Sequence, residues 1–283
     1  MIAAKIKVHA SRKTRIGNMI NNLVILALSL IVVVPILIVV FNSFKTQAEA
    51  ASFTLSLPSS FSLDNYAEVF RTSNIGRAML NGTIYCVGAS VLVMVVSSLA
   101  AFVLNRRQTK ASKLIYYLFL LGLVLPMSII PTIMLTKALG LYGSYINLVL
   151  LYTAFNIPFC VFMYYNFMGT IPRSLDEAVV IDGGNAFALY TKFIFPLLKP
   201  VSITTLLIVG TGIWNDFYYQ LYFTRSSTMW AMPMTVYGYF GQYSRSWNLV
   251  CADIMIAMLP VMVLFIAFQK QIVEGMTVGS VKG

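Results

Sequence analysis

The stretch Met19–Phe41, MINNLVILALSLIVVVPILIVVF, contains no charged residue. A helix rises about 1.5 Å per residue, so roughly 20 consecutive apolar residues cross the hydrocarbon core of a bilayer. Basic residues precede this stretch, as they do in a signal peptide. Its apolar run is too long for that alternative, and no small-residue cleavage site follows it. We therefore interpret the stretch as a membrane span.

Similar apolar segments recur along the chain. We expect about six transmembrane helices, over Met19–Phe41, Met79–Leu104, Leu114–Leu135, Asn147–Met168, Val201–Phe223 and Ile254–Gln269. The last of these is the shortest and could begin near Asn248. Hydrophobic residues make up 59% of the 283 residues and charged residues only 10%, whereas a soluble domain carries about 25% charged residues. The sequence therefore predicts an all-α membrane protein.

Lysine and arginine are distributed unevenly between the loops. Fourteen of the 20 lie in the N-terminal tail, the second and fourth loops and the C-terminal end. Because positively charged loops stay in the cytoplasm, both termini are expected there, as tails 1–18 and 273–283 around a membrane domain 19–272. The net charge of +11 then reflects topology and attraction to anionic membrane lipid rather than nucleic-acid binding.

Residues suited to covalent chemistry are scarce. The single histidine, His9, lies in the N-terminal tail, and Cys86, Cys160 and Cys251 stand apart from one another without a metal-binding or redox spacing. The sequence contains neither the phosphate-binding G-x-x-x-x-G-K-[ST] pattern nor the common hydrolase patterns. We therefore expect a protein without metal or cofactor, and not an enzyme.

Two other classes of membrane protein fit these features less well. A membrane-embedded hydrolase needs a Ser/His or metal pair, and His9 lies in the wrong compartment. An ion-coupled secondary transporter is expected to have several intramembrane charges and an inverted repeat, but the chain offers chiefly Asp216 and no clear internal symmetry. The composition thus favours neither alternative.

The fourth loop, Gly169–Pro200, is too long for a simple connection between helices. Ser174 followed by Glu177 predicts a capping box at the start of a short helix over Leu175–Asp182. The pair Gly183-Gly184 then supplies a helix stop, because glycine adopts positive φ at little cost. A two-turn helix is not stable alone in water, so a partner on the cytoplasmic side must pack against it.

A second helical pattern begins at Asn185 and meets Pro196. Helical spacing predicts one shared face for the first helix and another for the second. The residues on these faces are Leu175, Ala178, Val179 and Asp182 in the first, and Phe187, Tyr190, Thr191 and Ile194 in the second.

This loop resembles the EAA loop of binding-protein-dependent ABC importers, whose pattern is Glu-Ala-Ala, Gly, nine residues and Ile-x-Leu-Pro. Here the corresponding residues are Glu177-Ala178-Val179, Gly183 and, after nine residues, Phe193-Ile194-Phe195-Pro196. The replacements at Val179, Phe193 and Phe195 keep the apolar character of the pattern. The string IPRSLDEAVVIDGG is similar to the carbohydrate branch of the family.

Further segments extend the resemblance over nearly the whole chain. They are Leu139-Gly140-Leu141, Trp214-Asn215-Asp216, Leu259-Pro260 and the ending Glu274–Gly283, which contains Gly-x-Thr-x-Gly-x-Val-Lys-Gly. All are similar to the shorter permease of maltose-type sugar importers.

The resemblance implies a type I ABC importer permease fold in a prokaryotic inner membrane. It implies a subunit that forms half of the pathway for a sugar or oligosaccharide. The implied partners are a second, homologous permease in a heterodimer, a dimer of ATPase subunits, which would hold ATP and Mg²⁺, and an extracytoplasmic solute-binding protein. No nucleic acid is implied.

The family's short helix docks in a cleft of the ATPase, which implies a coupling role for several residues here. These are Glu177, Ala178, Asp182, Gly183, Lys282 and Gly283. Glu177 would pair with a basic residue of the ATPase, while Ala178 and Gly183 would allow close backbone approach. In the alternative interpretation, Glu177 is only the capping-box carboxylate and Gly183 only a helix stop, and the two roles can coexist.

Candidate residues of the substrate pathway are Asn156, Asn215, Asp216, Tyr218, Tyr239 and Tyr243. An ionisable side chain within an apolar segment costs about 2.5–3.5 kcal/mol on insertion scales and is a functional candidate by default. Asp216 could contact the solute, or it could hold a neighbouring helix through a buried hydrogen bond.

Two groups of residues allow both a substrate role and a structural one. The aromatic residues of the fifth loop, Thr224–Cys251, could stack on sugar rings or form an interfacial belt. In the family, this loop can enter the binding protein. Pro126 and Pro131 in the third segment and Pro158 in the fourth are expected to kink their helices, and Pro158 could line the pathway or lie at a helix contact.

Overall fold

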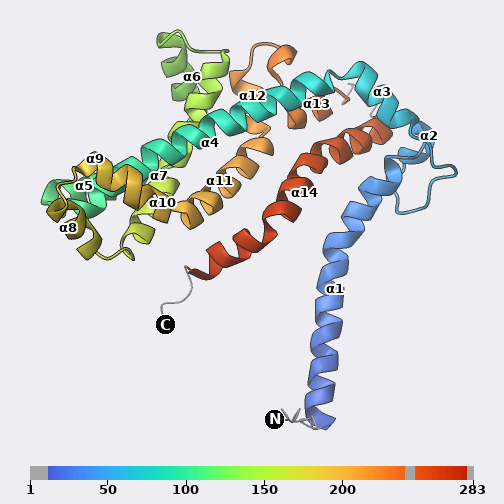
Figure 1. The fold of residues 1–283 in the computed structure, drawn as a ribbon. Helices are drawn as coiled ribbons and strands as arrows, with labels where there is room; N and C mark the ends of the chain where they lie inside the picture. The colour runs from blue at the N-terminus through green and yellow to red at the C-terminus, as the bar shows by residue number, and fades with distance from the viewer. Residues whose placement is uncertain (1–11, 240–245, 279–283) are drawn as a thin grey trace. The chain divides into compact units, whose positions relative to one another are not determined.

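The computed structural model describes residues 12–239 and 246–278, and the regular structure in those ranges is helical throughout (Figure 1). Four helices are long and apolar enough to cross a membrane, with two bent helix pairs raising the number to as many as six. The four are α1 (Arg12–Asn42), α4 (Ile75–Arg106), α7 (Tyr145–Met168) and α14 (Trp247–Val278). The predicted all-α membrane class is confirmed.

The chain divides into two compact units, Met1–Val69 with Tyr239–Ile256, and Phe70–Gly238 with Ala257–Gly283. In the first unit, α1 is followed by α2 (Gln47–Ala50), a turn and α3 (Asp64–Thr72). Lys45 is only 2% exposed, and its Nζ donates to the Thr54 carbonyl at 2.8 Å and to Ser56 Oγ at 3.1 Å. Asn65 Nδ2 donates to the carbonyls of Ser43 and Lys45, so the Lys45 ammonium and the Asn65 amide organise this segment.

The second unit is built on α4, α7 and α11 (Lys199–Trp214), which pack on one another, with α5 (Lys110–Val124) against α7. Small residues such as Ala89, Ser97 and Ala101 are fully buried on α4, and small side chains allow close helix approach in membranes. Buried hydroxyl groups add hydrogen bonds between helices, for example between Ser98 Oγ and the Tyr190 hydroxyl at 2.7 Å. Such bonds matter because lipid offers backbone and side-chain donors no alternative partner.

The third predicted span, Leu114–Leu135, is wrong as a single helix. It is divided into α5 and α6 (Ile129–Ala138), which meet at an angle of 118°. Leu125 is extended, with ψ at 121°, because the residue before a proline disfavours the helical region and Pro126 has no amide hydrogen to continue the ladder.

The fifth predicted span, Val201–Phe223, is also wrong in its bounds. The helix α11 begins at Lys199 and ends at Trp214, and a separate helix, α12, covers Tyr218–Phe223. The predicted span breaks after Trp214 because the Asp216 carboxylate accepts hydrogen bonds from the amides of Tyr219 and Gln220, at 3.1 and 3.4 Å. These bonds cap the new helix α12. The last span begins at Trp247, in agreement with the earlier start that the sequence allowed.

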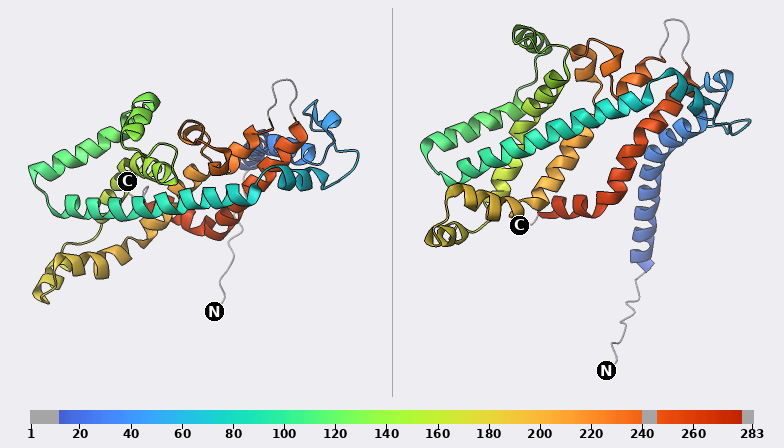
Figure 2. Two further views of the ribbon diagram at one scale, coloured as in Figure 1. Left: turned by 90° about the horizontal axis from the view of Figure 1, so that it is seen from above. Right: turned by 45° about the horizontal axis from the view of Figure 1, so that its top comes forward.

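Shorter helices occupy the two ends of the second unit (Figure 2). At one end lie α8 (Ser174–Ile181), α9 (Ala186–Ala188), the π-helix η1 (Leu189–Ile194) and α10 (Phe195–Leu197). At the other lie α6, α12, the 3₁₀ turn η2 (Ser227–Met229) and α13 (Met232–Tyr237). Because α4 and α7 both finish beside α8, this end gathers the termini of two spans around the fourth loop.

Candidate functional site

The short helix of the fourth loop, α8, starts without the predicted capping box. Its N-cap residue is Arg173, and Ser174 is already helical. The amides of Asp176 and Glu177 both donate to the Arg173 carbonyl, at 2.9 and 3.2 Å. A backbone turn after Pro172 therefore uses the donors that the Ser174 side chain was expected to satisfy, and the Glu177 carboxylate is not needed for capping.

The helix ends in a Schellman motif. The Gly184 amide donates to the Val179 carbonyl at 2.8 Å, and the Gly183 amide donates to the Val180 carbonyl at 3.0 Å, which is the hydrogen-bond pattern of that motif. Gly183 has φ at +76°, a conformation that L-residues rarely adopt. The predicted glycine stop is confirmed.

Most of α8 is exposed. Val179 is 6% exposed and packs into the core, while Glu177, Ala178, Asp182 and Gly183 are all exposed. Of the residues predicted to share a face, Val179 is buried and Leu175 is half-buried, whereas Ala178 and Asp182 are exposed. Three large apolar side chains also face outward at this tip: Val180, Ile181 and Phe187, which are 67%, 84% and 76% exposed. Lys282 and Gly283 lie outside the described residues.

The second helical pattern begins where it was predicted, with Asn185 Oδ1 accepting the Ala188 amide at 2.8 Å. It then continues as a π-helix, with the Phe195 amide bonded to the Tyr190 carbonyl. The π-helical turn precedes Pro196, which has no amide hydrogen to donate to the carbonyl four residues back. Of the four residues predicted to share a face, Tyr190 and Ile194 are buried, whereas Phe187 and Thr191 are exposed.

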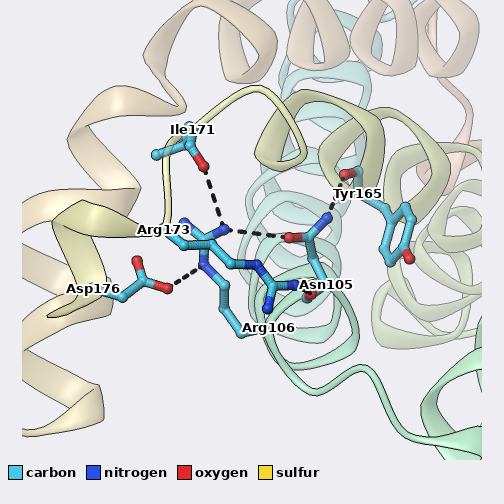
Figure 3. Close-up of polar contacts among 6 residues, drawn as sticks. All are labelled: Asn105, Arg106, Tyr165, Ile171, Arg173 and Asp176. Carbon is cyan, nitrogen blue, oxygen red and sulfur yellow. Dashed lines mark hydrogen bonds and ion pairs between the residues drawn. The ribbon is translucent and has the colours of Figure 1, made fainter.

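A polar network ties α8 to the ends of α4 and α7 (Figure 3). Arg106 Nε lies 2.7 Å from Asp176 Oδ2 in an ion pair. Arg173 Nη2 donates to the Asn105 carbonyl at 3.3 Å, and Asn105 Nδ2 donates to the Tyr165 carbonyl at 3.1 Å. Sequence reasoning missed this network, because it counted Arg106 only as a topological charge and did not consider Asp176. The one available signal was a polar Asn-Arg pair at the end of an apolar segment.

The same residues border a cavity of about 260 Å³. Its lining residues are Asn105, Arg106, Gln108, Gly169, Thr170, Ile171, Pro172 and Arg173. The end of α4 and the loop after α7 are thus held together by polar contacts rather than by continuous apolar packing.

Asp216 lies at the junction of α7, α11 and α12. Tyr152 donates its hydroxyl to Asp216 Oδ2 at 2.7 Å, and the Gln220 side chain donates to the Asp216 carbonyl at 2.8 Å. The Gln220 Oε1 in turn accepts the Ala231 amide at 2.8 Å. This geometry is that of the structural alternative, in which Asp216 joins neighbouring helices through hydrogen bonds.

The other pathway candidates are placed differently. Asn156, half-buried on α7, donates to the Tyr152 carbonyl at 2.8 Å, while Asn215 is exposed. Tyr218 is 53% exposed, and its ring contacts those of Tyr219 and Tyr222 edge-on. Asp216 and Tyr218 thus lie at the start of α12, whereas the hydrogen bond of Asn156 stays within α7.

The last two pathway candidates lie elsewhere. Tyr239 belongs to the first unit and is half-buried there, and Tyr243 lies outside the described residues.

The segment after α12 is fastened to the start of α4. Asn81 Nδ2 donates to the carbonyls of Thr228 and Trp230, both at 2.9 Å. Tyr85 donates to the Met229 carbonyl at 2.9 Å. Three consecutive carbonyls are therefore bonded to α4 side chains, which holds part of the fifth loop in a defined position.

Residues 93–278 match the family of inner-membrane components of binding-protein-dependent transport systems. This chain belongs to that family. The permease is 33% identical over 273 residues to the probable starch degradation products transport system permease protein AmyC of Thermoanaerobacterium thermosulfurigenes, covering 96% of this chain and 99% of that protein. It is also 33% identical over 260 residues to the multiple sugar-binding transport system permease protein MsmG of Streptococcus mutans, covering 89% and 93%.

The permease also resembles solved structures. Its fold matches a chain of a bacterial ABC transporter involved in the import of the acidic polysaccharide alginate, with a TM-score of 0.81, 20% identity, and coverage of 92% of this chain and 98% of that chain. A second match, with a TM-score of 0.57, 17% identity, and coverage of 72% and 80%, is to the alginate transporter in complex with an alginate pentasaccharide-bound periplasmic protein. The likeness confirms the fold of an ABC importer permease. The chain is a multi-pass inner-membrane transport subunit.

Proposed function

We propose that this permease forms half of the translocation pathway for a sugar or oligosaccharide and receives the force for transport from a separate ATPase through α8. The names of related permeases support a carbohydrate substrate: starch degradation products, multiple sugars, and melibiose, raffinose and stachyose in MelC of Bacillus subtilis, which is 31% identical. The assignment of the pathway to a sugar rests on these relatives.

The observation that carries the coupling role is the exposed surface of α8. A two-turn helix has little stability of its own, yet α8 exposes Val180 and Ile181 together with Glu177, and the following helix α9 exposes Phe187. Apolar side chains rimmed by polar groups mark protein contact surfaces. A cleft of the ATPase that buries the apolar residues and pairs with Glu177 would stabilise this helix.

The proposed assembly contains this chain, a second homologous permease, two ATPase subunits with their ATP and Mg²⁺, and an extracytoplasmic solute-binding protein. We place both termini in the cytoplasm on the distribution of Lys and Arg. Asp182, Gly183, Lys282 and Gly283 are then proposed to contact the ATPase as well. No covalent chemistry is assigned to this chain.

For the substrate pathway, we propose different roles at the α7–α12 junction. The Asp216 carboxylate already accepts hydrogen bonds from Tyr152 and from α12, so it holds the junction in shape. Tyr218, whose side chain is more than half exposed, is proposed to stack on a sugar ring. Asn156, Asn215, Tyr239 and Tyr243 are retained as candidate pathway residues.

Replacement of Glu177 by alanine tests the coupling role. Sugar uptake and co-purification of the ATPase with the permease should both fall, while permease abundance in the membrane stays unchanged because Glu177 is exposed. Lys192→Ala is the matched control, since Lys192 is an exposed charge of the same loop outside α8. Wild-type uptake and ATPase retention in a well-expressed Glu177→Ala variant would show that Glu177 does not couple the two subunits.

A further inference from the structure

We infer that the Arg106–Asp176 ion pair is a positioning contact that makes α8 move together with α4, so that displacement of the loop reaches a membrane span. This inference rests on the proposed function of α8 and names the residues inside the permease that would transmit the movement. The two residues lie 70 positions apart, at the end of α4 and in the first turn of α8.

The contacts around Arg106 link three elements (Figure 3). Its Nε faces Asp176 Oδ2 at 2.7 Å, and its Nη1 lies 3.5 Å from the Ile171 carbonyl, in the segment that joins α7 to α8. From the side of α8, Arg173 Nη2 donates a hydrogen bond to the Asn105 carbonyl of α4 at 3.3 Å. The end of α4 and the beginning of α8 therefore contact each other in both directions, each through an arginine of its own.

Each charge of the pair also suits the helix that carries it. Arg106 lies in the last turn of α4 and Asp176 in the first turn of α8. Cations are favourable near the C-terminus of a helix and anions near the N-terminus, because of the aligned peptide dipoles. The pair joins the two helix ends at a place where both charges are already stabilised.

The ion pair is also shielded from solvent. The side chains of Arg106 and Asp176 are 12% and 21% exposed. A shielded pair is screened less by salt than a surface pair, and removal of one partner leaves the other charge poorly solvated. The contact therefore resists separation better than a typical surface ion pair does.

Little else in the described residues holds α8 to the second unit. Val179 is its one buried side chain, and Leu175 and Asp176 are half-buried. Without the ion pair, the Arg173–Asn105 hydrogen bond is the remaining polar contact between α8 and α4 in the described residues, so α8 could shift further relative to α4. We expect that such a permease still binds the ATPase but wastes part of the ATP that is hydrolysed.

The test measures sugar transported per ATP hydrolysed by the complete transporter in proteoliposomes, together with ATPase co-purification. Arg106→Met should lower the transport-to-ATP ratio several-fold without abolishing transport, because the second permease keeps its own contact with the ATPase. Asp176→Asn, which preserves size, should act in the same direction. Arg106→Lys should recover only part of the ratio, since an ammonium group cannot reproduce the fork of the guanidinium.

The matched control is Arg107→Met. Arg107 is the next residue, carries the same charge and is exposed, so this variant should keep the wild-type ratio. The charge-reversed double variant Arg106→Asp/Asp176→Arg should transport more per ATP than either single reversal, which would show that the two positions act as a pair.

The inference fails if Arg106→Met and Asp176→Asn couple transport as Arg107→Met does, or if the double reversal is no better than the worse single one. These outcomes separate it from the proposed function. If Glu177→Ala weakens ATPase retention while Arg106→Met leaves coupling intact, α8 is the docking element and only the ion-pair role is wrong. If neither variant has an effect, the coupling role of α8 is wrong as well.

Discussion

Replacing Gly183 and Gly184 with asparagine, one at a time, should have opposite consequences for α8. At Gly183 the backbone has φ at +76°, and a Cβ added there would meet no atom within 4 Å. At Gly184, an added Cβ would lie 2.5 Å from Val179 Cγ1 and 2.9 Å from the Val179 carbonyl oxygen. The first position is constrained by backbone conformation and the second by space.

The magnitudes follow from these two constraints. An L-residue in the left-handed region costs roughly 1–2 kcal/mol, but asparagine is among the residues that adopt it most readily at helix ends. Gly183→Asn should therefore preserve the motif. Overpacking costs about 1–3 kcal/mol, and the Val179 carbonyl cannot retreat without lengthening its 2.8 Å hydrogen bond from the Gly184 amide. Gly184→Asn should therefore open the end of α8.

Hydrogen exchange of the loop peptides in the purified transporter measures this difference. We expect amide exchange at residues 183 and 184 to accelerate by roughly 5- to 150-fold in Gly184→Asn, the range that corresponds to a loss of about 1–3 kcal/mol. Gly183→Asn should exchange nearly as the wild type does. Adding Val179→Ala to Gly184→Asn should restore only part of the protection, because it removes the Cγ1 collision and leaves the carbonyl one.

Equal exchange in the two asparagine variants, or greater damage at Gly183, would refute this reasoning. Sugar uptake and ATPase co-purification provide a second measurement on the same variants. Since Gly183→Asn leaves α8 formed but adds bulk to its exposed tip, reduced ATPase retention in this variant would come from the contact surface and not from unfolding. Gly183→Val adds backbone strain to a side chain at the same exposed position, so its ATPase retention and sugar uptake should fall further than those of Gly183→Asn.

Three further outcomes are expected. Tyr152→Phe should lower the thermal unfolding midpoint of the purified complex, because it removes a hydrogen bond to the Asp216 carboxylate. A hydrogen bond of this kind contributes about 1–3 kcal/mol to stability. An unchanged midpoint would show that this bond does not brace the junction. Gln220→Leu should be at least as damaging by the same measurement, since it leaves the buried Ala231 amide without its acceptor, whereas Lys192→Ala should not shift the midpoint. On a cysteine-free background, an impermeant thiol reagent applied outside intact cells should label Ser227→Cys and spare Thr109→Cys, and the reverse pattern would overturn the proposed orientation.

Local features of the sequence determined a large part of this protein. The apolar runs of α1, α4 and α7 were found because transfer into lipid depends on the composition of a single window of about 20 residues. The glycine stop of α8 was predictable for a similar reason, since tolerance of positive φ belongs to the glycine residue itself. The family resemblance also lay in short strings of residues, and the matches to related permeases confirm it.

Only the tertiary structure decided which apolar segments remain continuous. Pro35, Pro158 and Pro260 lie inside unbroken helices, whereas the chain turns by 118° at Pro126. A proline removes one hydrogen bond wherever it occurs, so the residue type alone does not determine whether the chain bends there. The kinks predicted at Pro126 and at Pro158 thus had different outcomes, a sharp turn at the first and a continuous helix at the second.

The start of α8 and its attachment to α4 were likewise beyond local reasoning. The predicted capping box gave way to a backbone turn at Pro172, because several groups competed for the same amide donors and the loop's path after α7 selected among them. Arg106 and Asp176 meet across 70 residues of chain, and no local window contains both. Insertion into lipid and preferred backbone angles are properties of short segments, but an ion pair between two helix ends exists only once the spans have packed.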